Sequence, residues 1–310
     1  MAYSAAALTS AETTGFTNDK PMFVVQQAGT ASDAHFTSDG EHVDTDKTDS
    51  SFPAARAYDD LGSLLTKYAS ASASDSTKYY NFYFATGITF DTVIILGHNF
   101  NSLSLTTAAI EIADSEDFSS NQKRIAAFTI SGGSADSRFA IFNLNSESGG
   151  TAYSSSGTAQ RYSNVQYVRL KLTKSSGSYT PEVGEIILGR RYQLQRNPDL
   201  PYNNKNEQSL VSDYVSNSGI TKRYTFYRGQ AVRAFQASIS ASAEITVIDD
   251  WFNDINEGTR PFVYVETPSS SPKSQLMILD DAGLSFPLVG PTERRLAFGM
   301  TEQPPFLSRE

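Results

Sequence analysis

Between residues 79 and 189 the chain repeats short β-favouring runs separated by turns, and this pattern constrains the fold most strongly. Run 79–84 is mostly aromatic, whereas 92–97 is continuously apolar, as in a strand buried on both faces. Run 109–114 alternates apolar and polar residues, as a half-buried strand does. Similar runs follow at 124–130, 138–144, 165–172 and 184–189. Because Ser/Gly/Asn-rich turns separate them and no long helical pattern intervenes, the sequence predicts a β-sandwich.

The second half of the chain has a different pattern. Runs 208–215 and 220–227 flank a Ser-Asn-Ser-Gly turn at 216–219, which predicts a hairpin. The clearest helix pattern covers 243–257, between an expected N-cap at Ser242 and an expected C-cap at Gly258. Its apolar face is formed by Ile245, Ile248, Phe252 and Ile255. Further strands are expected at 231–240, 261–266, 275–279 and 294–301.

These patterns predict five parts. The first is an N-terminal arm, 1–20, and the second is a β domain over 21–190 that begins with a strand at 22–27. That domain contains a long irregular insertion, 28–78, in which 56–65 is expected to form a short helix. Two prolines within 195–201 indicate a linker, 191–207, before the second domain at 208–303 and a C-terminal tail at 304–310.

Composition excludes several function classes. The chain has no cysteine and three histidines, which excludes disulfide scaffolds, thiolate metal sites and a cysteine nucleophile. No run approaches the roughly 20 apolar residues that span a bilayer, so we expect no membrane insertion. The N-terminal residues also lack a signal-peptide pattern, and the absence of cysteine fits synthesis in a reducing cytosol.

The formal charge of −9 is unevenly distributed. Residues 1–150 hold 8 basic and 18 acidic side chains, a net charge of −10, whereas residues 151–310 hold 17 and 16, a net charge of +1. Opposed patches of this kind can steer subunits together, although solvated loop charge is an equal alternative. Because the basic residues are scattered, we expect no specific nucleic-acid binding.

No catalytic, metal or cofactor constellation emerges from the motifs. The acidic stretch with Asp44, Asp46 and Asp49 lacks the glycine and the bidentate glutamate of a calcium-binding loop. One histidine, His42, together with these carboxylates is a poor ligand set for a transition metal. His98 follows a buried strand, where a hydrogen bond to its own loop is favoured over a catalytic role. Two acidic pairs, Glu182 with Glu185 and Asp249 with Asp250, have no sequence sign of the cleft that glycosidase chemistry needs. Two glycine pairs, Gly132-Gly133 and Gly149-Gly150, lack the lysine of a Walker phosphate-binding loop. We therefore expect a non-enzymatic protein without cofactor or metal.

Two stretches resemble a known family. Leu96-Gly97-His98-Asn99 after a buried strand, with Gly184-Glu185-Ile186 and a glycine at 189, resembles the galactose-binding-like (discoidin-like) jelly roll of tailed-bacteriophage structural proteins over roughly 79–190. From about 208 to 302, the order of elements is similar to the tail-tube-type sandwich of distal tail and baseplate proteins, although here the jelly roll comes first. The resemblance implies a mainly β fold: a jelly-roll β-sandwich followed by a tail-tube-like β-sandwich or barrel with one flanking helix.

The resemblance also implies a function. We expect a virion structural protein, made in the host cytoplasm, that forms a three-fold or six-fold ring with copies of itself in a phage tail tip or baseplate. Its partners would be other phage tail proteins, and the candidate assembly contacts are Arg190, Arg191, Arg196 and Trp251. For Trp251, packing in the core is the favoured alternative.

Two further functions stay open. The first is a carbohydrate-binding host-attachment module that holds a host surface glycan with loop aromatics. Its candidates are Tyr153, Tyr162 and Tyr179, for which local packing is the favoured alternative. The second is a hydrolase with an unrecognised cleft.

Overall fold

The structure is a computed structural model, and it describes most of the 310 residues. The described residues are 2–9, 20–27, 33–38, 50–58, 66–67, 76–100, 102–129, 139–145, 158–175, 177, 179–194, 196–197, 199, 203–208, 211–215, 221–225, 230–239, 242–266, 274–280 and 294–302. The chain divides into two compact units. The first comprises 1–13, 26–191 and 305–310, and the second comprises 14–25 and 192–304.

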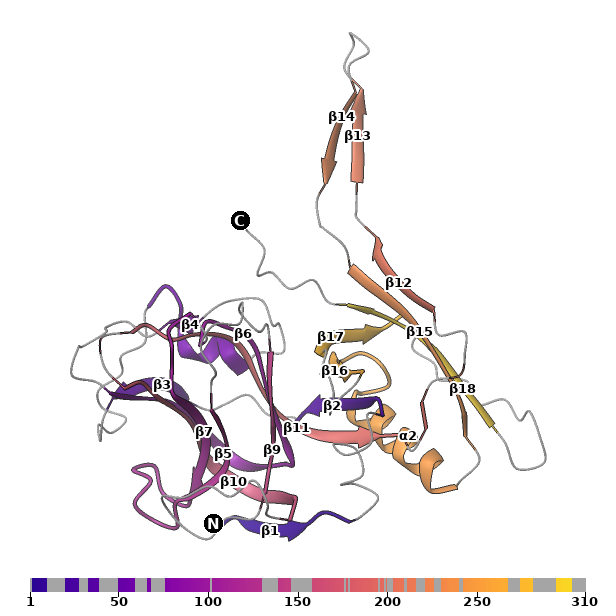
Figure 1. Cartoon of the computed structure of the whole chain (residues 1–310). Coiled ribbons are helices and arrows are strands. Elements are labelled where there is room, and N and C mark those ends of the chain that lie inside the picture. Colours follow the sequence, from indigo (N-terminus) through magenta and orange to yellow (C-terminus); the bar gives the residue numbers. More distant parts are fainter. Residues whose placement is uncertain are drawn as a thin grey trace. The chain divides into compact units, whose positions relative to one another are not determined.

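The first unit is a sandwich of two antiparallel sheets (Figure 1). Its first sheet has the order β3-β5-β10-β7-β8, with β1 paired to the beginning of β10; the strands are β1 (Ser4–Ala7), β3 (Asp33–Ser38), β5 (Thr77–Phe90), β7 (Thr107–Ala113), β8 (Lys123–Thr129) and β10 (Gln160–Thr173). Its second sheet has the order β11-β6-β9, with the short β4 on β11; the strands are β4 (Thr66–Lys67), β6 (Thr92–His98), β9 (Phe139–Asn143) and β11 (Glu182–Gln193). The 3-10 turn η1 (Ala54–Tyr58) contributes to the same core. The predicted mainly β, jelly-roll sandwich is confirmed.

Alternation along two long strands builds this core. Tyr80, Phe82 and Phe84 of β5 are at most 2% exposed, whereas the residues between them are half-buried. In β10, Val168, Leu170 and Leu172 are buried in the same alternating manner. Each such burial contributes roughly 1.5–3 kcal/mol to stability. The alternation gives the first sheet an inner face of buried apolar side chains and an outer face of polar and aromatic side chains.

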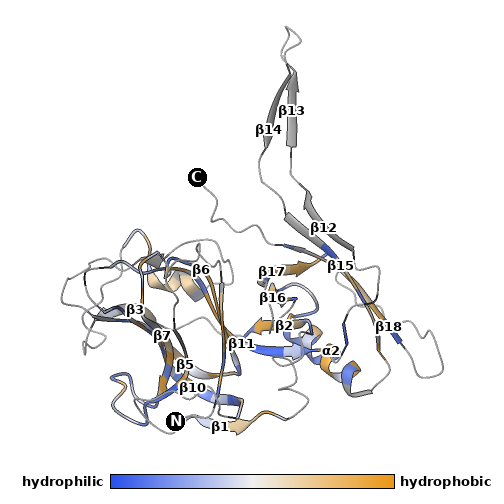
Figure 2. Ribbon diagram, viewed as in Figure 1, coloured by the Kyte–Doolittle hydropathy of each residue, from blue (hydrophilic) through white to orange (hydrophobic). Residues whose placement is uncertain are grey.

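The second unit combines one sheet with one helix. The sheet contains, in order, β12 (Asn203–Gln208), β15 (Gln230–Ile239), β18 (Arg294–Glu302), β17 (Ser274–Leu279), β16 (Phe262–Val265) and β2 (Met22–Gln26). Helix α2 (Ser242–Asp254) buries Ile248 and Trp251, and Ile255 just beyond its end, in the unit's core. Asp249 and Asp250 are exposed, which gives the helix the two-sided colouring of Figure 2. Two further strands, β13 (Val211–Val215) and β14 (Thr221–Thr225), form a separate two-stranded ladder.

Several predicted boundaries differ from the structure. Residues 4–7 of the predicted arm form β1, because their backbone pairs with Ser163 to Gln160 of β10. The strand at 22–26 packs in the second unit, since Phe23 and Val25 lie in that unit's core. The predicted insertion 28–78 contains β3, η1 and β4. Of the helix expected at 56–65, residues 56–58 lie in η1, and 59–65 lie outside the described residues. At the end of α2, the left-handed conformation begins at Asn256, before Gly258.

Candidate functional site

The outer face of the first sheet gathers the aromatic and charged side chains that point away from the core. Register places Tyr83 opposite Tyr167, Asn81 opposite Arg169, and Tyr79 opposite Lys171 on β5 and β10. On the other side of β10, Arg169 lies opposite Glu111 of β7, which lies opposite Arg124 of β8. We call this set the outer face: Tyr79, Asn81, Tyr83, Glu111, Arg124, Tyr167, Arg169 and Lys171.

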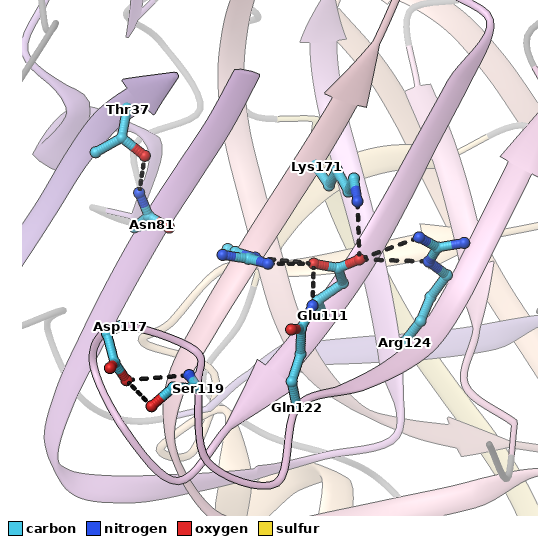
Figure 3. Close-up of polar contacts among 9 residues, drawn as sticks. Thr37, Asn81, Glu111, Asp117, Ser119, Gln122, Arg124 and Lys171 are labelled. Carbon is cyan, nitrogen blue, oxygen red and sulfur yellow. Dashed lines mark hydrogen bonds and ion pairs between the residues drawn. The ribbon is translucent and has the colours of Figure 1, made fainter. Parts of the chain in front are cut away.

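A fully buried carboxylate organises the charged half of this face (Figure 3). Glu111 Oε2 accepts hydrogen bonds from Arg169 Nε at 2.8 Å and Gln122 Nε2 at 3.0 Å. Its Oε1 lies 3.3 Å from Arg124 Nη2 and 3.6 Å from Lys171 Nζ. Burial by itself would raise the pKa of Glu111, but the charges of Arg169, Lys171 and Arg124 and the Arg169 hydrogen bond outweigh burial and lower that pKa. The carboxylate therefore stays ionised and is unsuited to donate a proton as a general acid.

Two aromatic rings hold the Arg169 guanidinium in place. The guanidinium carbon lies 4.1 Å from the ring centre of Tyr79 and 4.1 Å from that of Phe118. Phe118 comes from the loop between β7 and β8, where it has a left-handed φ of 54°. The neighbouring Asp117 braces this turn, because its carboxylate accepts hydrogen bonds from the Ser119 amide at 3.0 Å and hydroxyl at 2.7 Å. Stacking and charge pairing together fix Arg169 in one orientation.

The other half of the outer face is a stacked pair of tyrosines, Tyr83 and Tyr167, which we call the aromatic step. Tyr83 and Tyr167 stack with ring centres 5.0 Å apart and planes inclined by 22°. Both residues are half-buried, so part of each remains accessible. Desolvation, followed by the neighbouring Tyr83 and the charge of Glu116, raises the pKa of Tyr167. Beside the rings, Asn81 Nδ2 donates to Thr37 Oγ1 at 2.9 Å (Figure 3).

This arrangement is suited to binding a ligand. It supplies flat aromatic surface, amide and guanidinium donors, and a fixed carboxylate, all carried by strands rather than loops. Within the described ranges, no three His, Asp or Glu side chains gather as a metal ion would require. In that same part of the chain, no helix has the length and apolar character needed to cross a bilayer.

The tyrosines expected to contact glycan lie elsewhere. Tyr162 and Tyr179 are each 3% exposed, because both rings pack in the core of the first unit. The Tyr162 hydroxyl donates to the Asn145 carbonyl at 2.8 Å, and the Tyr179 hydroxyl donates to the Leu172 carbonyl at 3.1 Å. In this structure neither ring presents a face to a ligand. Tyr153 lies outside the described residues.

The four candidate assembly contacts are divided between the units. Trp251 is fully buried and stacks on Phe23 with ring centres 4.5 Å apart, which matches its alternative as a core residue. Arg191 is 5% exposed, and its Nη1 donates to Asn143 Oδ1 at 3.3 Å. Arg190 is half-buried and Arg196 is exposed. Burial leaves Arg190 and Arg196 as the accessible members of the set.

The remaining candidates are placed as structural residues where the structure describes them. His98 is buried and stacks on Phe100 at 4.3 Å, and its Nδ1 accepts the Phe100 amide hydrogen bond at 3.3 Å. Glu185 is fully buried, whereas Glu182 is half-buried. The acidic loop at 42–49 and the glycine pairs at 132–133 and 149–150 lie outside the described residues.

The outer face does not coincide with the tyrosines predicted from the loops. Its signal is nevertheless present: Tyr79, Asn81 and Tyr83 alternate with the core residues of β5, and Tyr167, Arg169 and Lys171 do so in β10. Period-2 alternation predicts which residues share a face. The partners Glu111 and Arg124 depend on the order of strands, which alternation does not reveal.

Comparison with known proteins gives weak likenesses that cover about half of the chain. No protein-family model and no curated protein matches the chain. Among solved structures, chitosan-binding module 1 from the chitosanase/glucanase of Paenibacillus sp. IK-5 is 17% identical, covers 52% of this chain and 95% of its own, and has a TM-score of 0.33. The family 32 carbohydrate-binding module of C. perfringens NanJ in complex with galactose is 10% identical, covers 53% and 96%, and has a TM-score of 0.32. The lectin binding domain of Lectinolysin complexed with Lewis b is 11% identical, covers 54% and 98%, and has a TM-score of 0.33. These values are too low to indicate what this chain binds.

Proposed function

We propose that the chain is a non-enzymatic glycan-binding protein whose first unit holds carbohydrate on the outer face of its first sheet. The observation that carries the proposal is the Tyr83–Tyr167 stack, with Asn81 and Arg169 one step along the same two strands. A sugar ring offers an apolar face and a rim of hydroxyls. An aromatic step beside fixed donors matches both properties.

The rigidity of the face supports the same proposal. All four of these side chains stand on β5 and β10, which are paired from Tyr167↔Tyr83 to Thr173↔Thr77 without a register shift. A preorganised face loses little conformational freedom when it binds, and weakly held ligands such as sugars benefit most from that. The proposed site is thus a sheet face rather than the segment before β11 that carries Tyr179.

A glycan array probed with the full chain tests this proposal. We expect saturable binding to a subset of glycans. Tyr83→Ala and Tyr167→Ala should each weaken that binding tenfold or more, as for truncated aromatic hot spots. The matched variants Tyr83→Phe and Tyr167→Phe keep the aromatic rings, so their affinity for the glycan should fall much less. A blank array, or alanine variants that bind as wild type while keeping their unfolding midpoint, would refute the proposal.

A second candidate function is assembly into a phage tail tip or baseplate ring in the virion. The observation in its favour is the β13–β14 ladder, whose described strands pair only with each other. An isolated two-stranded hairpin is marginally stable in water, so an adjacent subunit that packs on it would stabilise it. Both functions are compatible, because a ring subunit can carry a glycan-binding unit.

Light scattering on the purified full chain tests the ring. We expect a discrete three-fold or six-fold oligomer that dissociates when 211–225 is replaced by a short Gly-Ser turn. Glycan binding by the first unit should survive that deletion. A monodisperse monomer at every concentration, with the chain absent from purified virions, would exclude the ring.

A further inference from the structure

We infer that the ligand of the outer face is an acidic sugar, one that carries a carboxylate or sulfate; this rests on the proposed function. Arg124, Arg169 and Lys171 all lie within 3.6 Å of the single carboxylate of Glu111. These four side chains together carry a charge of +2. A neutral glycan would leave this charge without use, whereas an anionic group would bind it directly.

Register arranges the face into two subsites along the strands. The Tyr83–Tyr167 pair is followed by Asn81–Arg169 and then by Tyr79–Lys171. Successive pairs are two residues apart along each strand, so the Tyr83–Tyr167 pair and Lys171 are about 13–14 Å apart along the strand. This length accommodates more than one sugar ring. One ring can stack on Tyr83 and Tyr167 while the acidic group of a neighbouring ring reaches the cations.

The exposure of the cations indicates which of them meets the ligand. The side chain of Lys171 is 24% exposed, compared with 17% for Arg124 and 14% for Arg169. Lys171 is also the most distant of the three from Glu111, at 3.6 Å, and its ammonium lies 5.7 Å from the Tyr79 ring. Lys171 is therefore the cation of the three that an incoming anion can reach most readily.

The ionised carboxylate of Glu111 positions the arginines of the face. This carboxylate has no exposed surface, so it cannot repel an anion through direct contact. It holds Arg169 and Arg124 so that their charges are preorganised before the ligand arrives. The same arrangement without stacked rings would be a general polyanion site. The Tyr83–Tyr167 pair restricts it to anions whose ring has an apolar face.

Isothermal titration with polygalacturonate oligosaccharides, compared with the same oligosaccharides after reduction of their carboxyl groups, tests this inference. We expect the acidic form to bind at least tenfold more tightly and its affinity to fall as salt rises, because the exposed charges are screened. Lys171→Gln should lower that affinity about tenfold, whereas the reduced form should lose little. Lys174→Gln is the matched control, since Lys174 lies beside Tyr179 rather than on the outer face.

The outcomes separate this inference from the proposed function. Equal affinity for the acidic and reduced forms, with a loss in Tyr83→Ala, would overturn the acidic preference and keep glycan binding. Equal binding of poly-glutamate, unaffected by Tyr83→Ala, would reveal a general polyanion surface and overturn the inference. A Lys171→Gln variant that binds the acidic form as wild type, with an unchanged unfolding midpoint, would also overturn it. No binding of any glycan would refute the proposed function itself.

Discussion

Replacing Glu111 by glutamine should destabilise the first unit and leave the second largely unaffected. The substitution keeps the shape of the side chain but removes the charge that Arg124, Arg169 and Lys171 share. Breaking a buried ion pair costs about 3–5 kcal/mol. Here the cations are 14–24% exposed, so water compensates in part and we expect a loss of about 2–4 kcal/mol.

Urea unfolding at pH 7 measures this loss. With a slope of about 2 kcal/mol per M, the middle of the typical range, the midpoint for the first unit should fall by about 1–2 M. Hydrogen exchange in peptides that cover β7 and β10 reports the unfolding of the first unit. Trp251 is the single tryptophan and lies in the core of the second unit, so its fluorescence follows that unit separately. Asp249→Asn is the control, because Asp249 is exposed on α2, and its loss should stay within about 1 kcal/mol.

The pH dependence provides an independent test of the same carboxylate. Because the pKa of Glu111 is lower in the folded unit than its ordinary value of 4.5, its stabilisation is fully present above that value. The stabilisation disappears as the pH falls through the folded pKa. The difference between wild type and Glu111→Gln should therefore shrink in acid. Equal midpoints at pH 7, or a difference that grows in acid, would refute the reasoning.

Three further changes probe packing, backbone and ionisation. Trp251→Phe should cost only about 1–2 kcal/mol in urea unfolding, against about 3–5 for Trp251→Ala, because the indole Nε1 has no hydrogen-bond partner among the described residues; equal losses would contradict this. Gly87→Ala should destabilise the first unit by about 1–3 kcal/mol, since φ is +66° and the new Cβ would lie 2.6 Å from Asn164 Oδ1. Gly177→Ala shares the positive φ but meets no atom within 4 Å, so a thermal melt should show a smaller shift. Burial and the charge of Asp114 raise the pKa of Tyr3 to about 12, so its contribution to stability is complete below pH 10 and is lost as the pH rises; an absorbance titration of Tyr3→Phe should lack this late step.

Local patterns in the sequence were sufficient for the elements with strong periodicity. The alternation of β10 and the helical spacing of Ile248 and Ile255 each bury one face against a core, and such burial follows directly from period. The strands expected at 92–97 and 275–279 appear as β6 and β17 for the same reason. The mainly β fold follows from these elements together.

Boundaries and partners needed information that lies far away in the chain. Ser4–Ala7 has no strand pattern of its own, and it becomes β1 because β10 offers it a backbone edge more than 150 residues later. The position of Phe23 in the second unit likewise depends on Trp251 and Phe262.

The charge of the chain shows most clearly what sequence and tertiary structure each determined. The sequence alone established the net charge, the absence of cysteine and the side chains that share a face of β5 or β10. It could not show that Glu111 lies among Arg124, Arg169 and Lys171, because β7, β8 and β10 are brought together only by strand pairing. Only the tertiary structure could bury Tyr162 and Tyr179 and leave Tyr83 and Tyr167 accessible, since two sheets must pack before one tyrosine becomes core and another becomes surface.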